Sequence, residues 1–118
     1  RRLLANLIDN GIQAGQAHGR PGRVHLSTSL GARALTCFID DEGPGVRPSN
    51  AAAIFEPYFT TKKSGTGLGL SIAKTIAIDH GGDLEVAAAP SPLGGARFIV
   101  TIPLASEAPP PAPSRAET

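Results

Sequence analysis

The chain has 118 residues, 41% of them hydrophobic, and its 11 basic residues nearly balance 10 acidic ones. This length is enough for one domain with a modest core, while the balanced charge and 4% aromatic content exclude the basic, aromatic surface typical of nucleic-acid binders. A single cysteine, Cys37, excludes a disulfide framework and indicates a buried strand thiol. No apolar run reaches membrane-spanning length and no signal peptide is visible. We therefore expect a cytoplasmic segment without membrane contact, whose full-length protein could still be membrane-anchored.

The first half of the chain predicts a helix followed by a hairpin. Apolar residues recur at helical spacing over residues 3–18. Alternating side chains over 23–29 and 34–40 predict two antiparallel strands joined by a short turn. One or two helical turns are predicted over 49–55, with Ser49 as a cap. The chain lacks methionine and starts inside the helical pattern, so we expect it to be a piece of a longer protein.

The second half predicts another helix and two more strands. The helix covers residues 68–80 and ends at the glycine pair 81–82. Strands are predicted over 83–88 and 96–104. Beyond them the chain is rich in proline and has little to bury, which indicates a domain over 1–104 and a disordered tail or linker over 105–118.

The order of these elements indicates the fold class. A helix, two strands, a helix and two strands do not alternate as βαβ units. We therefore predict an α+β, two-layer α/β sandwich with a mixed, mostly antiparallel sheet and helices on one face. A doubly wound dinucleotide-binding fold would place its glycine-rich turn after the first strand. Here that turn follows a long irregular loop, which disfavours the alternative.

Three alternate glycines, at positions 65, 67 and 69, run directly into the second predicted helix. Glycine lets backbone N–H groups approach an anion closely, and the positive end of a helix dipole favours phosphate. The segment therefore predicts a polyphosphate site. A strand, a glycine-rich turn and a helix also make a dinucleotide fingerprint, so this motif alone leaves both possibilities open.

Asn6 and Asn10 stack on one face of the first predicted helix, at the edge of its apolar arc. Asparagine is a mediocre helix former, and its amide oxygen is a hard ligand that suits Mg²⁺. Either asparagine alone is equally well explained as a solvated side chain or as a partner of nearby backbone.

Four motifs together resemble the ATP-binding domain of bacterial two-component sensor histidine kinases. Residues 6–11 (NLIDNG) resemble the N box, 41–45 (DEGPG) the G1 box, 55–62 (FEPYFTTK) the F box and 65–70 (GTGLGL) the G2 box. They occur in the family's order and with similar spacing. The resemblance implies a Bergerat-type (GHKL) fold that binds ATP and Mg²⁺. Family domains begin with one more strand and helix, so this chain is expected to be N-terminally truncated, with an exposed sheet edge or helix face.

The resemblance also implies roles for single residues. Asn10 matches the magnesium ligand, and Asp41 matches the aspartate that accepts a hydrogen bond from the adenine amino group. Asp40, its neighbour, is expected to face the other way into solvent. Asn6 replaces a glutamate that activates water in ATP-hydrolysing relatives; because an amide is a poor base, this favours phosphotransfer. Lys62 lies in a lid expected between residues 46 and 65, where it either meets the γ-phosphate or is solvated.

The other implied nucleotide-binding residues are glycines, apolar residues and one threonine of the same motifs. Gly43 and Gly45 let the backbone pass close to the base. In the family, Phe55 and Phe59 anchor the lid, although such phenylalanines are more often simple core residues. The G2 box contributes Gly65, Thr66, Gly67, Leu68, Gly69 and Leu70. By contrast, Lys74 is expected at the surface, and the histidines at 18, 25 and 80 are expected to have structural or surface roles.

The function implied by the resemblance is transfer of the γ-phosphoryl group of ATP to a histidine. That histidine lies on the dimerisation and histidine-phosphotransfer helical domain of the same protein, and a response regulator receiver domain and a full-length homodimer are the further partners. The fragment alone is expected not to phosphorylate itself. Two alternatives remain: a nucleotide-binding regulatory or interaction module without kinase activity, and an ATP-hydrolysing GHKL relative.

Overall fold

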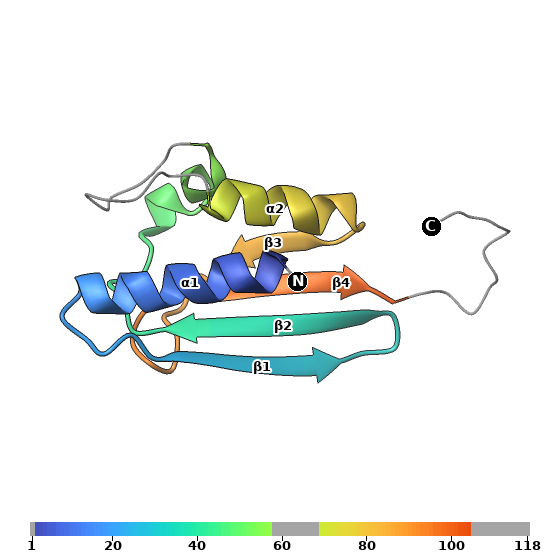
Figure 1. The fold of residues 1–118 in the computed structure, drawn as a ribbon. Helices are drawn as coiled ribbons and strands as arrows, with labels where there is room; N and C mark the ends of the chain where they lie inside the picture. The colour runs from blue at the N-terminus through green and yellow to red at the C-terminus, as the bar shows by residue number, and fades with distance from the viewer. Residues whose placement is uncertain (1, 58–68, 105–118) are drawn as a thin grey trace, which may run out of the picture.

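The computed structural model describes residues 2–57 and 69–104, which form two layers (Figure 1). One layer contains α1 (Arg2–Ala17) and α2 (Gly69–Asp79). The other is a sheet whose strands are β1 (Val24–Leu30), β2 (Ala34–Asp41), β3 (Asp83–Val86) and β4 (Arg97–Pro103). Both helices lie on the same face of this sheet, so the predicted two-layer α+β architecture is confirmed.

The described strands are arranged in the order β1-β2-β4-β3, and every neighbouring pair is antiparallel. The predicted hairpin is therefore correct, with Val24 opposite Asp41 at its open end. The β2–β4 pairing places Asp40 opposite Arg97, so the end of β2 lies beside the start of β4. β1 forms one edge of the sheet, where Leu26 and Leu30 are 43% and 74% exposed.

The core lies between the helices and the sheet. Successive strand residues point to opposite faces, so alternate residues of β2 and β4 face the helices. The buried apolar residues are Leu3, Leu7, Cys37, Ile39, Ile54, Ala73, Ala77, Leu84, Ala96, Phe98 and Val100. Full burial of a large side chain of this kind stabilises the fold by about 1.5–3 kcal/mol. The predicted buried strand thiol is confirmed, because Cys37 is 7% exposed and burial raises its pKa.

Two glycines of α1 let this helix pack directly onto the end of β2. A Cβ at Gly11 would lie 2.9 Å from Val24 Cγ2 and 3.3 Å from Asp41 Cβ. A Cβ at Gly15 would lie 3.5 Å from Glu42 Cβ. Larger residues at these two positions would push the helix away from the sheet, so the glycines determine how closely α1 approaches Asp41.

The predicted helix boundaries are largely correct. Beyond α2, Gly81 has a φ of 82° and the Gly82 N–H donates to the Ala77 carbonyl at 2.9 Å, which is a glycine termination. The short turns predicted over 49–55 are two 3-10 helices, η1 (Pro48–Asn50) and η2 (Ala53–Phe55). The predicted Ser49 cap is wrong: Ser49 lies inside η1, because Pro48 starts that helix and Arg47 occupies its N-cap position. The predicted tail, 105–118, lies outside the described residues.

Candidate functional site

Asp41 is the last residue of β2, and its carboxylate is held in a fixed orientation. The residue is 2% exposed. Its Oδ1 accepts hydrogen bonds from the backbone N–H groups of Gly43 and Ala96, both at 2.9 Å. Its own backbone N–H donates to the Ala96 carbonyl at 3.1 Å. A buried carboxylate held by two backbone N–H groups has a fixed orientation, which suits recognition of a polar ligand by hydrogen bonding.

Two glycines beside Asp41, Gly43 and Gly95, occupy positions where the Cβ of any other residue would clash with neighbouring atoms. A Cβ at Gly43 would come within 2.8 Å of the Ala14 Cβ on α1. Gly45 has a φ of 82°, a left-handed conformation that favours glycine. On the opposite side, a Cβ at Gly95 would overlap Asp41 Oδ1 and lie 2.6 Å from the Asp41 carbonyl oxygen. The backbone therefore approaches Asp41 closely on the Gly43 side and on the Gly95 side.

Asn6 and Asn10 lie one helical turn apart on α1, and both are half-buried. Asn10 directly precedes Gly11, whose backbone lies against Asp41. Through Gly11, the structure packs α1 directly against Asp41, which is 30 positions further along the sequence. The amide oxygen of an asparagine is a ligand type that suits a hydrated Mg²⁺ ion.

Asp40 points to the sheet face opposite Asp41, as predicted, but the expectation that it is solvated is wrong. Its side chain is fully buried, and its two oxygens accept hydrogen bonds from Arg97 Nε at 2.7 Å and Arg97 Nη2 at 3.0 Å. These bonds raise the pKa of the Arg97 guanidinium, whose Cζ also lies 4.7 Å from the Phe38 ring centroid. Asp40 therefore links β2 to β4 instead of meeting solvent.

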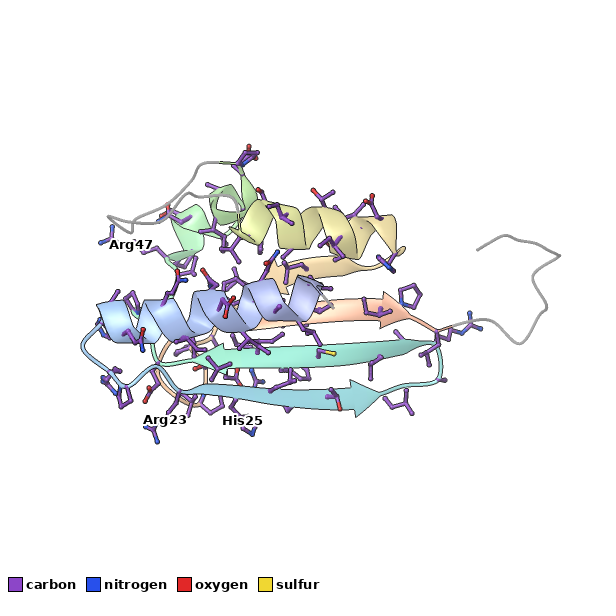
Figure 2. The ribbon with its side chains drawn as sticks, in the orientation of Figure 1. Arg23, His25 and Arg47 are labelled. Atoms are coloured by element: carbon purple, nitrogen blue, oxygen red, sulfur yellow. The ribbon has the colours of Figure 1, made fainter. Side chains whose placement is uncertain are left out.

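Glu42 has a structural role that the sequence motif did not reveal. It is 2% exposed, and its Oε1 accepts from the backbone N–H groups of Gly22 at 3.1 Å and Arg23 at 2.7 Å. Its Oε2 pairs with the Arg23 guanidinium, with Nη2 at 2.7 Å. Figure 2 shows the Arg23 side chain directed away from the helices. Glu42 thereby ties the α1–β1 connection to the loop after β2.

We expect the contribution of Glu42 to stability to depend on pH. The hydrogen bond from Arg23 lowers the pKa of Glu42 below its ordinary value of 4.5, so the folded state favours the ionised form. This contribution is fully present above about pH 4.5 and is lost as the pH falls through the lowered pKa. Glu42→Gln retains an acceptor for the two backbone donors but cannot ionise. The gap in unfolding free energy between wild type and Glu42→Gln should therefore narrow below pH 4.5.

Denaturant titrations from pH 7 to pH 3 measure this gap. The lowered pKa of Asp83, caused first by its hydrogen bond from Lys74, affects both proteins equally and cancels in the difference. A gap that stays constant over the whole range would contradict the role of Glu42 ionisation.

Phe55 and Lys74 connect η2, α2 and the sheet. The Phe55 ring meets the Phe98 ring edge-on, at a centroid separation of 6.3 Å and an interplanar angle of 80°. Lys74 Nζ lies 5.1 Å from the Phe55 centroid, donates to the Leu84 carbonyl at 2.8 Å and pairs with Asp83 Oδ1 at 2.7 Å. Lys74, which was expected at the surface, is half-buried there, and the chain segment at the start of β3 supplies two acceptors for it.

The remaining predicted site residues are only partly within the described structure. Gly69 and Leu70 begin α2, where Gly69 is exposed and Leu70 is half-buried. Phe59, Lys62, Gly65, Thr66, Gly67 and Leu68 lie outside the described residues, as does the last part of the expected lid, residues 58–65. All three histidines are exposed, and His25 Nδ1 lies 3.8 Å from Asp40 Oδ2.

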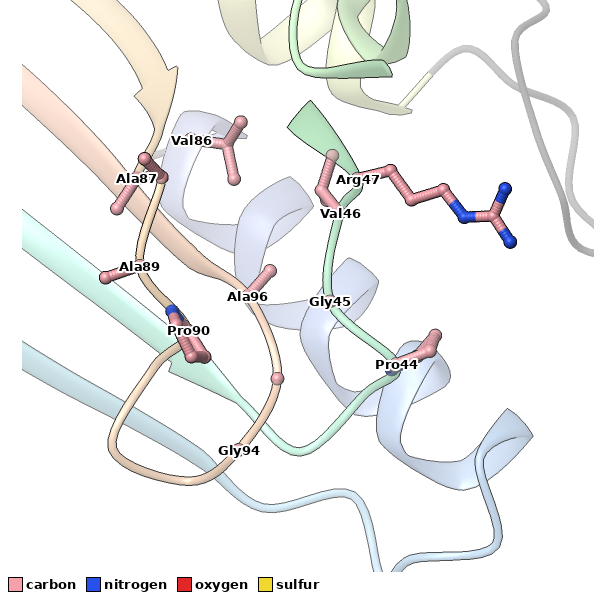
Figure 3. Close-up of a pocket in the computed structure, with 12 residues that line it drawn as sticks. Pro44, Gly45, Val46, Arg47, Val86, Ala87, Ala89, Pro90, Gly94 and Ala96 are labelled. Atoms are coloured by element: carbon pink, nitrogen blue, oxygen red, sulfur yellow. The ribbon is translucent and has the colours of Figure 1, made fainter. Parts of the chain in front are cut away.

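A cavity of about 230 Å³ lies next to this site (Figure 3). The loop after β2 forms one wall, with Gly45 and Val46. The end of β3, with Val86, and the β3–β4 connection, with Ala96, form the other. Arg47 extends away from the cavity. The space between the two loops is therefore bounded mainly by backbone and small apolar side chains.

Ser91, in the β3–β4 connection, is a buried residue that sequence reasoning passed over as part of a loop. It is 6% exposed and its hydroxyl donates to the Asp41 carbonyl. The usable signal in the sequence is a polar residue between Pro90 and Pro92, just before a glycine pair. Such a compact turn favours a side chain that bonds to backbone.

The chain matches known proteins over most of its length. A family model described as "Histidine kinase-, DNA gyrase B-, and HSP90-like ATPase" matches residues 1–106. Sensor histidine kinase ZraS of Escherichia coli O157:H7 is 38% identical over 103 residues, which are 87% of this chain and 21% of ZraS. The chain thus spans about a fifth of that relative.

Solved structures show the same relationship. The mycobacterial sensor histidine kinase MprB is 30% identical, with a TM-score of 0.74 over 86% of this chain and 68% of that one. The ATP-binding domain of PrrB from Mycobacterium tuberculosis is 31% identical, with a TM-score of 0.67 over 88% of this chain and 68% of that one. Within residues 2–57 and 69–104, no helix has the length and apolar character needed to cross a bilayer. The chain belongs to the histidine kinase-, DNA gyrase B- and HSP90-like ATPase family, and within it to the ATP-binding domains of sensor histidine kinases.

Proposed function

We propose that this domain binds ATP together with Mg²⁺ and donates the γ-phosphoryl group to a histidine on a helical domain of the same protein. The observation that carries the proposal is the buried Asp41 carboxylate, held by two backbone N–H groups between glycines that leave no space for a Cβ. These features fit a flat base that must be recognised by hydrogen bonding and approached closely by backbone.

Asp41 supplies the selectivity for adenine in this proposal. Its carboxylate accepts a hydrogen bond from the 6-amino group of adenine, whereas guanine presents a carbonyl oxygen at the same position. Two acceptors facing each other in a buried site lose their hydrogen bonds, which costs about 1–3 kcal/mol for each group left unpaired. Gly43 and Gly45 allow the loop to pass close to the base.

Asn10 is the proposed metal ligand. It is half-buried on α1 beside the region of Asp41, and its amide oxygen is a suitable ligand for Mg²⁺, which normally takes few protein ligands besides phosphates and water. When bound, the ion neutralises charge on the triphosphate. Asn6, one turn earlier, provides an amide where a water-activating base would be needed for hydrolysis. Asn10 would thus help to bind the triphosphate, while the lack of a base at Asn6 would keep hydrolysis by water slow.

The work of the chain is positioning, because phosphoryl transfer needs little covalent assistance from the protein. The glycines of the G2 box and Lys62 are proposed to contact the phosphates, and Phe55 and Phe59 to anchor the segment that covers them. The acceptor histidine belongs to a dimeric helical domain, within a full-length homodimer, and a response regulator receiver domain accepts the group next. None of the three histidines of this chain is assigned as the acceptor.

Asn10→Ala tests the proposal through the metal. This variant should lose the gain in ATP affinity that Mg²⁺ provides, because the ligand oxygen is removed, but it should still bind adenosine through Asp41. Calorimetric titrations with ATP, with and without Mg²⁺, and with adenosine measure both effects. In the full-length protein, the same substitution should reduce transfer of label from γ-labelled ATP to the helical domain, and the product should be acid-labile and base-stable.

The controls separate the alternatives. Gln16→Ala changes an exposed side chain near the end of α1 and should leave affinity and transfer unchanged. Equal Mg-ATP affinity in wild type and Asn10→Ala would rule out the metal assignment. Acid-stable label on a serine or threonine would rule out histidine transfer, and ADP release without labelled protein would identify an ATP-hydrolysing enzyme.

A further inference from the structure

The β3–β4 connection folds around the backbone of Asp41. Asp41 O accepts a hydrogen bond from Ser91 Oγ at 2.8 Å and another from the Gly95 N–H at 3.0 Å. One residue further, the Ala96 N–H donates to Asp41 Oδ1. Both the carbonyl and the carboxylate of Asp41 are therefore held by groups from one short segment that lies about fifty residues away in the sequence.

Ser91 closes this segment on itself. Its backbone N–H donates to the Gly95 carbonyl at 2.8 Å, and its carbonyl accepts from the Gly94 N–H at 2.9 Å. Its hydroxyl oxygen accepts from the Leu93 N–H at 3.1 Å while donating to Asp41. Every polar group of Ser91 thus makes a hydrogen bond within the turn or to Asp41, in a residue that is 6% exposed.

The geometry leaves little freedom at the contact. A Cβ at Gly95 would overlap Asp41 Oδ1 and lie close to the Gly43 nitrogen, so the turn is packed directly against the carboxylate. The same turn forms one wall of the cavity in Figure 3, through Gly94, Gly95 and Ala96. A shift of the turn would therefore move the two donors, Gly95 and Ala96, that orient Asp41.

We propose that Ser91 is a positioning residue for base selection: its hydroxyl locks the β3–β4 turn onto Asp41 and so fixes the carboxylate that recognises the 6-amino group of adenine. This inference rests on the proposed function, because it takes Asp41 as the acceptor for the base. Ser91 itself is buried beneath Asp41 and acts through it. Loss of the hydroxyl allows the β3–β4 turn to shift, so the Asp41 carboxylate takes up a wider range of orientations.

The test compares two nucleotides that differ only in the group Asp41 recognises. ATP and purine riboside triphosphate, which lacks the 6-amino group, are titrated into wild type, Ser91→Ala and Ser91→Cys, and thermal unfolding is followed in parallel. In wild type, ATP should bind more tightly. In Ser91→Ala, the ATP affinity should fall about tenfold, the size of one buried hydrogen bond, while the affinity for the analogue changes little. The ratio of the two affinities therefore moves towards one.

Ser91→Cys replaces the hydroxyl with a larger thiol that is a weaker donor, whereas Ser91→Ala leaves the position smaller. The two variants disturb the packing in opposite directions, so at least one of them should fold, and both should lower the ratio. Ser29→Ala, at an exposed position of β1, is the matched control and should keep the wild-type ratio. A folded Ser91 variant with an unchanged ratio would overturn the inference, even if its melting temperature falls. Equal binding of both nucleotides by wild type would overturn the assignment of Asp41 itself, and with it this inference.

Discussion

Asp41→Asn should weaken ATP binding by about 1–3 kcal/mol, or roughly five- to 150-fold, and should reduce discrimination against GTP. The amide oxygen can replace Oδ1 as the acceptor for Gly43 and Ala96, so the fold should survive. The amide nitrogen then faces the base as a donor, where the adenine amino group is also a donor. The guanine carbonyl, in contrast, gains a partner. Titration of ATP and GTP into the two proteins measures the change in each affinity.

Asp40→Asn is the matched control because it makes the same chemical change one residue away, on the opposite face of the sheet. It should weaken the pairing with Arg97 and lower the melting temperature, yet leave the ratio of ATP to GTP affinity unchanged. If Asp40→Asn alters that ratio and Asp41→Asn does not, the carboxylate has been assigned to the wrong residue.

Gly95→Ala should destabilise the domain and abolish selective binding of ATP. The added methyl group would overlap Asp41 Oδ1 and contact backbone atoms of Gly43 and Asp41. Overpacking of this kind typically costs about 1–3 kcal/mol, and we expect the upper end because backbone and a buried carboxylate cannot easily move aside. Chemical denaturation measures the stability loss, and titration with ATP and purine riboside triphosphate measures the loss of base recognition.

Gly31→Ala serves as the control for this experiment. Gly31 lies in the β1–β2 turn, where an added Cβ would meet only the Ala34 carbonyl, at 3.3 Å. It should therefore change stability little and leave nucleotide binding intact. Similar effects of the two substitutions would show that the damage at Gly95 reflects loss of glycine in general and not contact with Asp41.

Local patterns in the sequence were sufficient to predict most of the fold. The helical spacing of Leu3 and Leu7, the alternation along β2 and the glycines after α2 each act within a few residues, so they can be read without knowing the partner. The antiparallel hairpin followed from the same kind of signal. The resemblance implied that Asn10 and Asp41 belong to one site, which stays a prediction, and the structure packs α1 at Gly11 against the end of β2.

The missed features depend on residues that are far apart in the sequence. Asp40 was expected in solvent because nothing near it indicates Arg97, which is 57 residues away. Ser91 reaches Asp41 across 50 residues, and Glu42 meets Arg23 across 19. Lys74 donates to the Leu84 carbonyl in β3. This contact can be predicted only when the packing of α2 on the sheet is known. Polar side chains that join distant segments carry no periodic signal, so only the structure reveals their partners.

The reactivity of Cys37 can be used to measure how often the helix layer separates from the sheet. It is the only cysteine of the chain, it lies on the helix-facing side of β2, and burial both shields the thiol and raises its pKa. A thiol reagent should react slowly while the helices cover β2, because little of Cys37 is exposed and its raised pKa leaves little of the reactive thiolate. The labelling rate of Cys37 therefore measures the opening of the sheet beneath the site, and tightening of the domain by a bound nucleotide would be read as slower labelling.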